Sequence, residues 1–184
     1  VLWSNSGYKV AVIDADPQKS LSYWLSERKK YYGADDIGIN FYNFDIRNLA
    51  EEVKKIKRKY DFIIIDSPPA ITFETLQIIK ASNGVFVPVQ PSPLDLMATL
   101  PFLQIAREER KKPLIILNRV MPRAKLTDAM ILRLRYSGAK IARSRISSKV
   151  IFAESFAVGR GVIDINVTSD AAKEIINVGN EILR

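Results

Sequence analysis

The stretch that decides the fold is Tyr60-Asp61-Phe62-Ile63-Ile64-Ile65-Asp66-Ser67-Pro68-Pro69. Its four consecutive apolar residues are too few for a helix, and three of them are β-branched, which is typical of a strand buried on both faces of a parallel sheet. The prolines cannot continue a strand ladder, so the strand should end at Asp66 and leave this carboxylate at the carboxyl edge of the sheet. Ligands of open α/β sheets bind along that edge. For this run alone, the alternative is a strand followed by an ordinary Asp-Ser-Pro turn.

A second run of the same kind is Lys9-Val10-Ala11-Val12-Ile13-Asp14-Ala15-Asp16-Pro17-Gln18, which precedes a helical stretch from about Lys19. Two strands of one parallel sheet would bring Asp14, Asp16 and Asp66 to the same edge. Three clustered carboxylates repel one another unless a cation or a bound water network compensates them. Because all the ligands are oxygens, the cation should be a hard one, and we expect Mg²⁺ bridging a phosphate.

The remaining pattern alternates strands with helices. Further strands are expected at 39–44, 85–89, 113–119 and 140–146, and helices at 19–30, 46–59, 73–82, 94–109, 125–136 and 168–183. Asp45 is expected to cap the helix at 46–59, whereas residues 147–167 give no definite prediction. This alternation predicts an α/β fold of three layers, in which a mostly parallel sheet has helices on both faces.

The start of the chain resembles the end of an element. Val1 to Ser4 have the pattern of a helix tail, and Gly7 is expected at the left-handed capping position that ends it. We therefore expect residues 1–184 to be a single domain truncated at its N-terminus, without its first strand.

Composition excludes several kinds of chemistry. The 184 residues include no histidine and no cysteine, so a Ser-His-Asp triad, a thiolate nucleophile and a His/Cys zinc site are all excluded. No stretch approaches the ~20 apolar residues of a membrane helix, and no signal peptide is recognisable. The last helix carries Glu174 and Glu181 rather than a lysine-rich polar face, so we expect it to pack in the core and not on a membrane. The expected location is the cytoplasm.

The net charge of +8 is concentrated in one region. Arg107 to Lys149 contain thirteen Lys and Arg but three Asp and Glu, so the rest of the chain has a net charge of −2. Such asymmetry indicates a polyanionic partner, nucleic acid before membrane. The alternative is a solvated helical face. The side chains expected to neutralise phosphates are Arg133, Arg135, Lys140, Arg143, Arg145 and Lys149.

Three motifs, in order and at their separations, resemble those of the ParA/MinD family of deviant Walker ATPases. They are Val12 to Gln18, Tyr60 to Pro69, and Val87-Pro88-Val89-Gln90-Pro91-Ser92-Pro93-Leu94-Asp95. Within that family the chain most resembles the small ParF-type plasmid partition proteins, and the likeness covers nearly the whole chain. It implies a P-loop NTPase fold and an ATP-dependent homodimer that needs Mg²⁺. It also implies non-specific DNA binding, a ParB-like centromere-binding partner that stimulates hydrolysis, and a cytoplasmic protein associated with the nucleoid.

The resemblance also implies roles for single residues. Asp16 matches the aspartate that positions the attacking water, and Asp14 and Asp66 match the aspartates near Mg²⁺. Asn118, at the end of its strand, is similar in place to the asparagine that contacts adenine. Pro91 and Ser92 are similar to the family's loop beside the nucleotide and the dimer interface. Ordinary capping or turn chemistry is the alternative for Asn118 and Ser92.

One motif of the family is absent from the sequence. A glycine-rich run ending in Lys-Thr, whose amides and lysine hold the phosphates, occurs nowhere in the 184 residues. We therefore expect this polypeptide by itself to bind ATP weakly or not at all. Two alternative functions follow: a nucleotide-dead interaction module, and a metabolic relative such as a dethiobiotin-synthetase-like ligase, for which we identify no acyl-binding groups.

Overall fold

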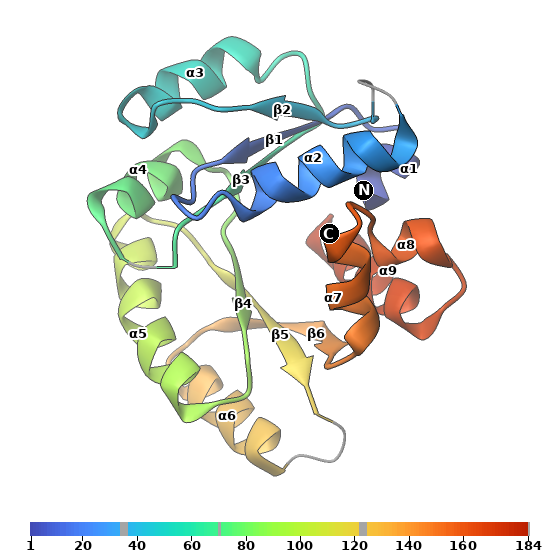
Figure 1. Ribbon diagram of the computed structural model, residues 1–184. Coiled ribbons are helices and arrows are strands. Elements are labelled where there is room, and N and C mark those ends of the chain that lie inside the picture. The colour runs from blue at the N-terminus through green and yellow to red at the C-terminus, as the bar shows by residue number, and fades with distance from the viewer. Residues whose placement is uncertain (34–36, 70, 122–124, 184) are drawn as a thin grey trace. The chain divides into compact units, whose positions relative to one another are not determined.

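The computed structural model describes residues 1–33, 37–69, 71–121 and 125–183 (Figure 1). The chain divides into two compact units. Unit 1 comprises Val1–Ala81 and Ile151–Val167, and unit 2 comprises Ser82–Val150 and Thr168–Arg184. Each unit contains a three-stranded parallel sheet with helices packed on both of its faces. This confirms the predicted α/β fold of parallel sheet and covering helices.

The sheet of unit 1 has the strand order β2-β1-β3. Its strands are β1 (Val10–Asp14), β2 (Asn40–Tyr42) and β3 (Phe62–Asp66). Its helices are α1 (Leu2–Asn5), α2 (Ser20–Tyr32), the 3-10 turn η1 (Ile46–Asn48), α3 (Leu49–Ile56), α4 (Phe73–Ala81), α7 (Val150–Ala157) and α8 (Val162–Ile165), of which α7 begins at the last residue of a unit 2 segment.

The central strand β1 is buried along its whole length, because helices cover both faces of the sheet. On one face, Val10 and Val12 pack with Trp24 of α2. On the other face, Ile13 packs with Leu49 of α3 and Ile78 of α4. The continuous apolar run in the sequence has its physical cause here, since successive side chains of a strand point to opposite faces.

The sheet of unit 2 has the strand order β4-β5-β6. Its strands are β4 (Phe86–Val89), β5 (Leu114–Val120) and β6 (Lys140–Ser147). Its long helices are α5 (Pro93–Glu108), α6 (Lys125–Tyr136) and α9 (Asp170–Ile182).

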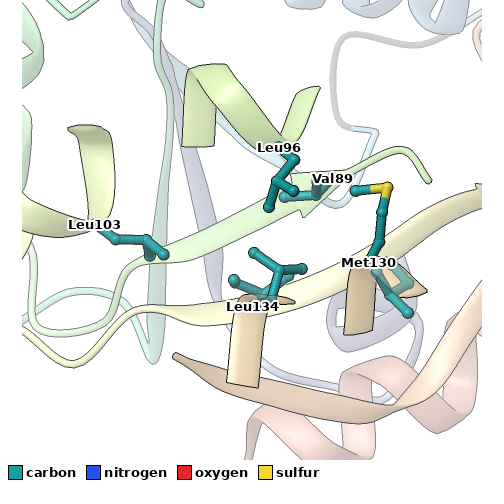
Figure 2. Close-up of a cluster of buried hydrophobic side chains, with 7 residues drawn as sticks. Val89, Leu96, Leu103, Met130 and Leu134 are labelled. Atoms are coloured by element: carbon teal, nitrogen blue, oxygen red, sulfur yellow. The ribbon is translucent and has the colours of Figure 1, made fainter. Parts of the chain in front are cut away.

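Two helices cover one face of this second sheet and one helix covers the other. Figure 2 shows Leu96 and Leu103 of α5 converging with Met130 and Leu134 of α6 and with Val89 of β4. On the opposite face, Leu114, Ile116 and Ala142 pack with Val178 of α9. The prediction that the last helix packs in the core is therefore confirmed.

Helix α9 also covers the outer edge of strand β6. Glu181 accepts hydrogen bonds from the backbone N–H groups of Arg143 (2.7 Å) and Ser144 (2.9 Å). Glu174 accepts one from the N–H of Ser147 (2.9 Å). Carboxylates thus satisfy donors of an edge strand that would otherwise be open to pairing with another strand.

Two local expectations need correction, and the segment without a prediction is now assigned. The helix expected at 46–59 is divided into η1 and α3, although Asp45 does cap η1 by accepting from the N–H of Arg47. The segment without a prediction contains α7 and α8. Strand β3 is not buried on both faces, since the Ile64 side chain is 41% exposed. Ile64 is exposed because β3 lies at an edge of the unit 1 sheet within the described part of the chain.

Among the residues described, no helix is sufficiently long and apolar to span a membrane.

Candidate functional site

Two of the predicted carboxylates lie side by side in unit 1. Asp14 and Asp66 are register partners at the carboxyl ends of the parallel strands β1 and β3. The pairing continues for one more residue, because the N–H of Ala15 donates to the carbonyl oxygen of Asp66 (2.9 Å). Asp16 follows one residue later, in the loop between β1 and α2. We call this end of the sheet, with Asp14, Asp16 and Asp66, the carboxylate edge.

Hydrogen bonds from Asp16 and Ser22 hold the side chain of Asp14 in place. Its side chain is buried, with 1% exposed. One carboxylate oxygen accepts from the N–H of Asp16 (3.2 Å), and the other accepts from the N–H (2.9 Å) and the hydroxyl (2.5 Å) of Ser22. Asp14 therefore caps the first turn of α2 and fixes the loop that carries Asp16, where a negative charge is favourable.

Asp66 is exposed to solvent, in contrast to Asp14. Partial withdrawal from water and the nearby negative charges of Asp14 and Asp16 raise the pKa of its carboxyl group. The carboxylate edge thus has negative charge that a cation would compensate. Mg²⁺ suits such a place, because it is usually bound through one or two carboxylates and keeps several waters.

The carboxylate edge does not by itself offer a metal ion three side-chain ligands. Within the described ranges, no three His, Cys, Asp or Glu side chains are placed so that they could hold a metal ion. The physical reason is that Asp14 points into the first turn of α2, where Ser22 occupies it. Asp66 is the more exposed of the two, and the roles of Asp14 and Asp66 near Mg²⁺ stay predictions.

Lys19 also lies at the carboxylate edge, and it was not predicted from the sequence. Its backbone is left-handed (φ 55°) at the start of α2, and its Nζ donates to the carbonyl oxygen of Asp14 (3.1 Å). Asp16 accepts from the N–H of Gln18 (2.9 Å) in the same loop. A lysine at a helix N-terminus is electrostatically unfavourable, and this mismatch is the signal that could have identified it.

The predicted nucleotide-side residues of unit 2 have local partners. Ser92 caps α5 by accepting from the N–H of Asp95 (3.1 Å), with Pro91 just before it. Asn118, half-buried in β5, accepts from the N–H of Arg119 (2.9 Å), whose backbone is left-handed (φ 51°). These contacts are of the capping and turn kind that is the alternative for Asn118 and Ser92. The nucleotide-side roles of Asn118, Pro91 and Ser92 stay predictions.

The six predicted DNA-contacting residues all belong to unit 2, and one of them is engaged elsewhere. The exposed ones are Arg133 and Arg135 on α6 and Lys140, Arg143 and Arg145 on β6. Lys149 is only partly exposed and forms an ion pair with Glu174 (2.7 Å). Its charge is therefore already compensated, because α9 brings a carboxylate to it. On β6 the arginines also suit an edge strand, where cations oppose unwanted pairing.

Comparison with known proteins finds a matching family and several sequence relatives. A family described as an AAA domain matches residues 36–116. "Maintenance of carboxysome distribution protein A" of Halothiobacillus neapolitanus is 26% identical over 182 residues, which is 95% of this chain and 83% of that protein. A ParA family protein of Mycoplasma genitalium is 24% identical over 156 residues, 81% of this chain and 58% of that protein.

Solved structures share the fold. Apo McdA from Cyanothece has a TM-score of 0.82 at 19% identity, covering 98% of this chain and 90% of that one. The cell division ATPase MinD of Pyrococcus furiosus has a TM-score of 0.79 at 18% identity, covering 98% and 87%. MinD of Pyrococcus horikoshii, solved with Mg-ADP, has a TM-score of 0.75 at 19% identity, covering 97% and 85%. These relatives confirm the resemblance to the ParA/MinD family of deviant Walker ATPases that the three motifs indicated, and the paired aspartates of β1 and β3 lie where that resemblance predicts them.

Proposed function

We propose that this chain is the switch domain of a ParA-type positioning protein, which uses Mg-ATP to control dimerisation and non-specific DNA binding in the segregation of a cargo. The observation that carries the proposal is the carboxylate edge. Asp66 is exposed there beside Asp14, and withdrawal from water together with the negative charges of Asp14 and Asp16 raises its pKa. Among the solved structures that share the fold, MinD of Pyrococcus horikoshii holds Mg-ADP, and an McdA variant of Cyanothece holds ATP.

Each residue of the carboxylate edge has a distinct part in this proposal. Mg-ATP, when bound, supplies a phosphoryl group that water can attack. Asp66 would hold the magnesium ion, and Asp16 would orient the water. Asp14 keeps the Asp16 loop in place through Ser22. The absent glycine-rich Lys-Thr run means that the chain offers no such loop for the phosphates.

The nucleotide part is tested by equilibrium binding of a fluorescent ATP analogue in Mg²⁺. The chain as printed is compared with a polypeptide extended upstream in the gene. If the upstream sequence encodes a glycine-rich Lys-Thr run, we expect the extended form to bind the analogue. Asp66→Asn should weaken that binding about tenfold or more, and Asp170→Asn, at an exposed residue of unit 2, should leave it unchanged. Equally tight binding by the printed chain would contradict the role of the absent loop. No binding by either form would favour the nucleotide-dead interaction module.

The DNA part depends on the exposed cations of unit 2. Because phosphates are the target, binding to random duplex should weaken steeply as salt increases. Arg143→Gln and Arg145→Gln should each reduce the slope of log affinity against log salt by about one. Lys57→Gln, an exposed lysine of unit 1, is the matched control and should leave the slope unchanged. Salt-independent binding, or equal effects of all three changes, would refute this use of the basic residues.

The cargo and the partner are the least specified part of the proposal. The relative from Halothiobacillus neapolitanus is named for carboxysome distribution, and the one from Mycoplasma genitalium only as a ParA family protein. The first name supports a role in positioning a cargo. A ParB-like centromere-binding protein, or an adaptor of another cargo, would stimulate ATP turnover. Analytical ultracentrifugation of the extended form with and without Mg-ATP tests the dimer. A monomer under both conditions would overturn the nucleotide-controlled dimerisation.

A further inference from the structure

The path of the chain between the two units has an unusual feature. Residues 151–167, here called the docking segment, lie in sequence between β6 and α9, which both belong to unit 2. The docking segment itself belongs to unit 1. The chain therefore crosses between the units three times, after Ala81, Val150 and Val167, and two of these crossings flank the docking segment.

The docking segment is attached to helix α2 by a buried ion pair. Arg28 Nη1 lies 2.6 Å from a carboxylate oxygen of Asp164, and both side chains are 5% exposed. The same Nη1 donates to the carbonyl oxygen of Gly159 (3.2 Å), and Trp24 Nε1 donates to that of Arg160 (3.2 Å). The guanidinium group of Arg28 also lies over the rings of Trp24 (5.2 Å) and Tyr32 (4.7 Å). Arg28 Nε is buried without a hydrogen-bond partner, so the Nη1 contacts and the two rings hold this charge. Removing the carboxylate of a buried ion pair leaves an uncompensated charge, which is costly.

The backbone of the docking segment approaches α2 as closely as a glycine allows. Gly159 has φ +68°, and a Cβ atom there would lie 2.0 Å from the backbone nitrogen of Arg28. The carboxylate oxygen of Asp164 that Arg28 binds also accepts from the N–H of Gly161 (2.9 Å), and the other oxygen accepts from Asn5 Nδ2 (3.3 Å). The contact between α2 and residues 159–164 is therefore a fitted one, and a shift of either element would break several interactions together.

Helix α2 is fixed at both of its ends. Its first turn is bound to Asp14 through Ser22, and Arg28, one turn from its end, is bound to Asp164. Two of the three chain crossings, after Val150 and Val167, lie at the ends of the docking segment. The interactions that hold this segment on α2 therefore also hold the chain that leads to β6 and to α9.

We propose that the Arg28–Asp164 pair is a latch that couples the two units into one cooperative fold, by fixing the docking segment on helix α2. The latch does not depend on ATP or DNA, so it can be tested separately from the proposed function. If it is released, unit 1 loses a stabilising element and unit 2 loses two of its three fixed chain connections, and the units unfold independently.

Urea unfolding followed by two probes tests the latch. Both tryptophans, Trp3 and Trp24, belong to unit 1, so tryptophan fluorescence reports on unit 1, whereas far-UV circular dichroism also reports on the helices of unit 2. In the unaltered chain we expect coincident midpoints. In Asp164→Asn, which keeps the shape but removes the charge, the fluorescence midpoint should fall by about 1–2 M urea, and the dichroism curve should divide into two steps.

The control is Lys30→Met on the same helix, which removes an exposed ion pair with Glu27 whose lysine side chain is 71% exposed. It should leave the midpoints coincident. Arg28→Lys keeps a cation and should separate the midpoints by a smaller amount; it replaces Asp164→Asn should that variant fail to fold. Three outcomes would overturn the proposal. The first is coincident midpoints in every folded variant of Arg28 or Asp164. The second is separate midpoints in the unaltered chain, and the third is separate midpoints in Lys30→Met.

Discussion

Units 1 and 2 have the same architecture and opposite electrostatic character. Each places three parallel strands between helices. Unit 1 has thirteen Lys and Arg and thirteen Asp and Glu, whereas unit 2 has fifteen against seven, so the whole net charge of +8 belongs to unit 2. The comparison teaches that the apolar pattern sets the architecture, while the charged residues, which pack little, are free to specialise. The carboxylate edge and the exposed cations proposed to contact DNA thus belong to different units.

The units also treat their sheet edges differently. In unit 2 the edge strand β6 is covered by Glu174 and Glu181 of α9. In unit 1 the edge strand β3 leaves Ile64 41% exposed and ends in the exposed Asp66. Glu174 and Glu181 therefore stabilise the fold of unit 2, whereas the negative charge of Asp66 lowers the stability of unit 1.

The largest expected effect tests whether the two cores are equally well packed. Leu49 of unit 1 and Leu134 of unit 2 are both fully buried, with 0% exposed. Changing either to alanine should lower the free energy of unfolding by about 2–5 kcal/mol, because each leaves a cavity. Urea unfolding followed by circular dichroism measures this. Leu132→Ala, at an α6 residue that is 53% exposed, is the control, and a loss equal to that of Leu134→Ala would refute the packing argument.

A smaller effect tests the covered edge of unit 2. Glu174→Gln removes the charge that binds Lys149 Nζ (2.7 Å) and the hydroxyl of Ser147 (2.7 Å). We expect a loss of about 1–3 kcal/mol in the free energy of unfolding, since charge-assisted hydrogen bonds are the stronger ones. Thermal unfolding measures it. Asp170→Asn on the same helix breaks only an exposed pair with Lys173 (3.5 Å) and should change little; the idea fails if the two variants behave alike.

The same carboxylates predict a dependence of stability on pH. Burial raises the pKa of Glu174, but hydrogen bonds from Lys149 and Ser147 outweigh it and hold the pKa below the ordinary value of 4.5. Because this pKa is lowered on folding, the stabilisation is present above pH 4.5 and is lost as the pH falls through the folded-state pKa. Urea midpoints of the unaltered chain should therefore fall between about pH 5 and pH 3. The fall should be smaller in Glu174→Gln, and an identical fall in both chains would contradict the assignment.

The smallest effect concerns the uncompensated carboxylate of unit 1. The pKa of Asp66 is raised by withdrawal from water and by Asp14 and Asp16, so folding disfavours its charged form. Without nucleotide or Mg²⁺, Asp66→Asn should therefore raise the free energy of unfolding at pH 7, by less than about 1 kcal/mol because the group is exposed. Asp61→Asn is the control and should weaken the fold, since Asp61 accepts from the N–H of Lys9 (2.8 Å). Destabilisation by Asp66→Asn would reverse our account of the carboxylate edge.

Much of the fold was predictable because its signals are local. Strands β1 and β3 follow from short apolar runs, and the prolines after them end the ladder. Parallel pairing then brings Asp14 and Asp66 to one edge, as predicted. Helices α7 and α8 were not predictable in this way. Helix α7 has apolar residues on most of its faces, yet its buried residue is Ser155, so no single apolar stripe marks its packed side. Helix α8 has four residues, too few for a periodic pattern.

The sequence by itself determined the fold class, the strand ends and the presence of Asp14 and Asp66 at one edge, because periodicity and chain-breaking residues act over a few positions. Only the tertiary structure decided what these groups do with one another. The pair Arg28–Asp164 joins residues 136 positions apart, and Lys149 meets Glu174 across 25 positions. Which charges are compensated and which stay free depends on such distant contacts, since the energy of a charge is set by its burial and its partners and not by its neighbours in the chain.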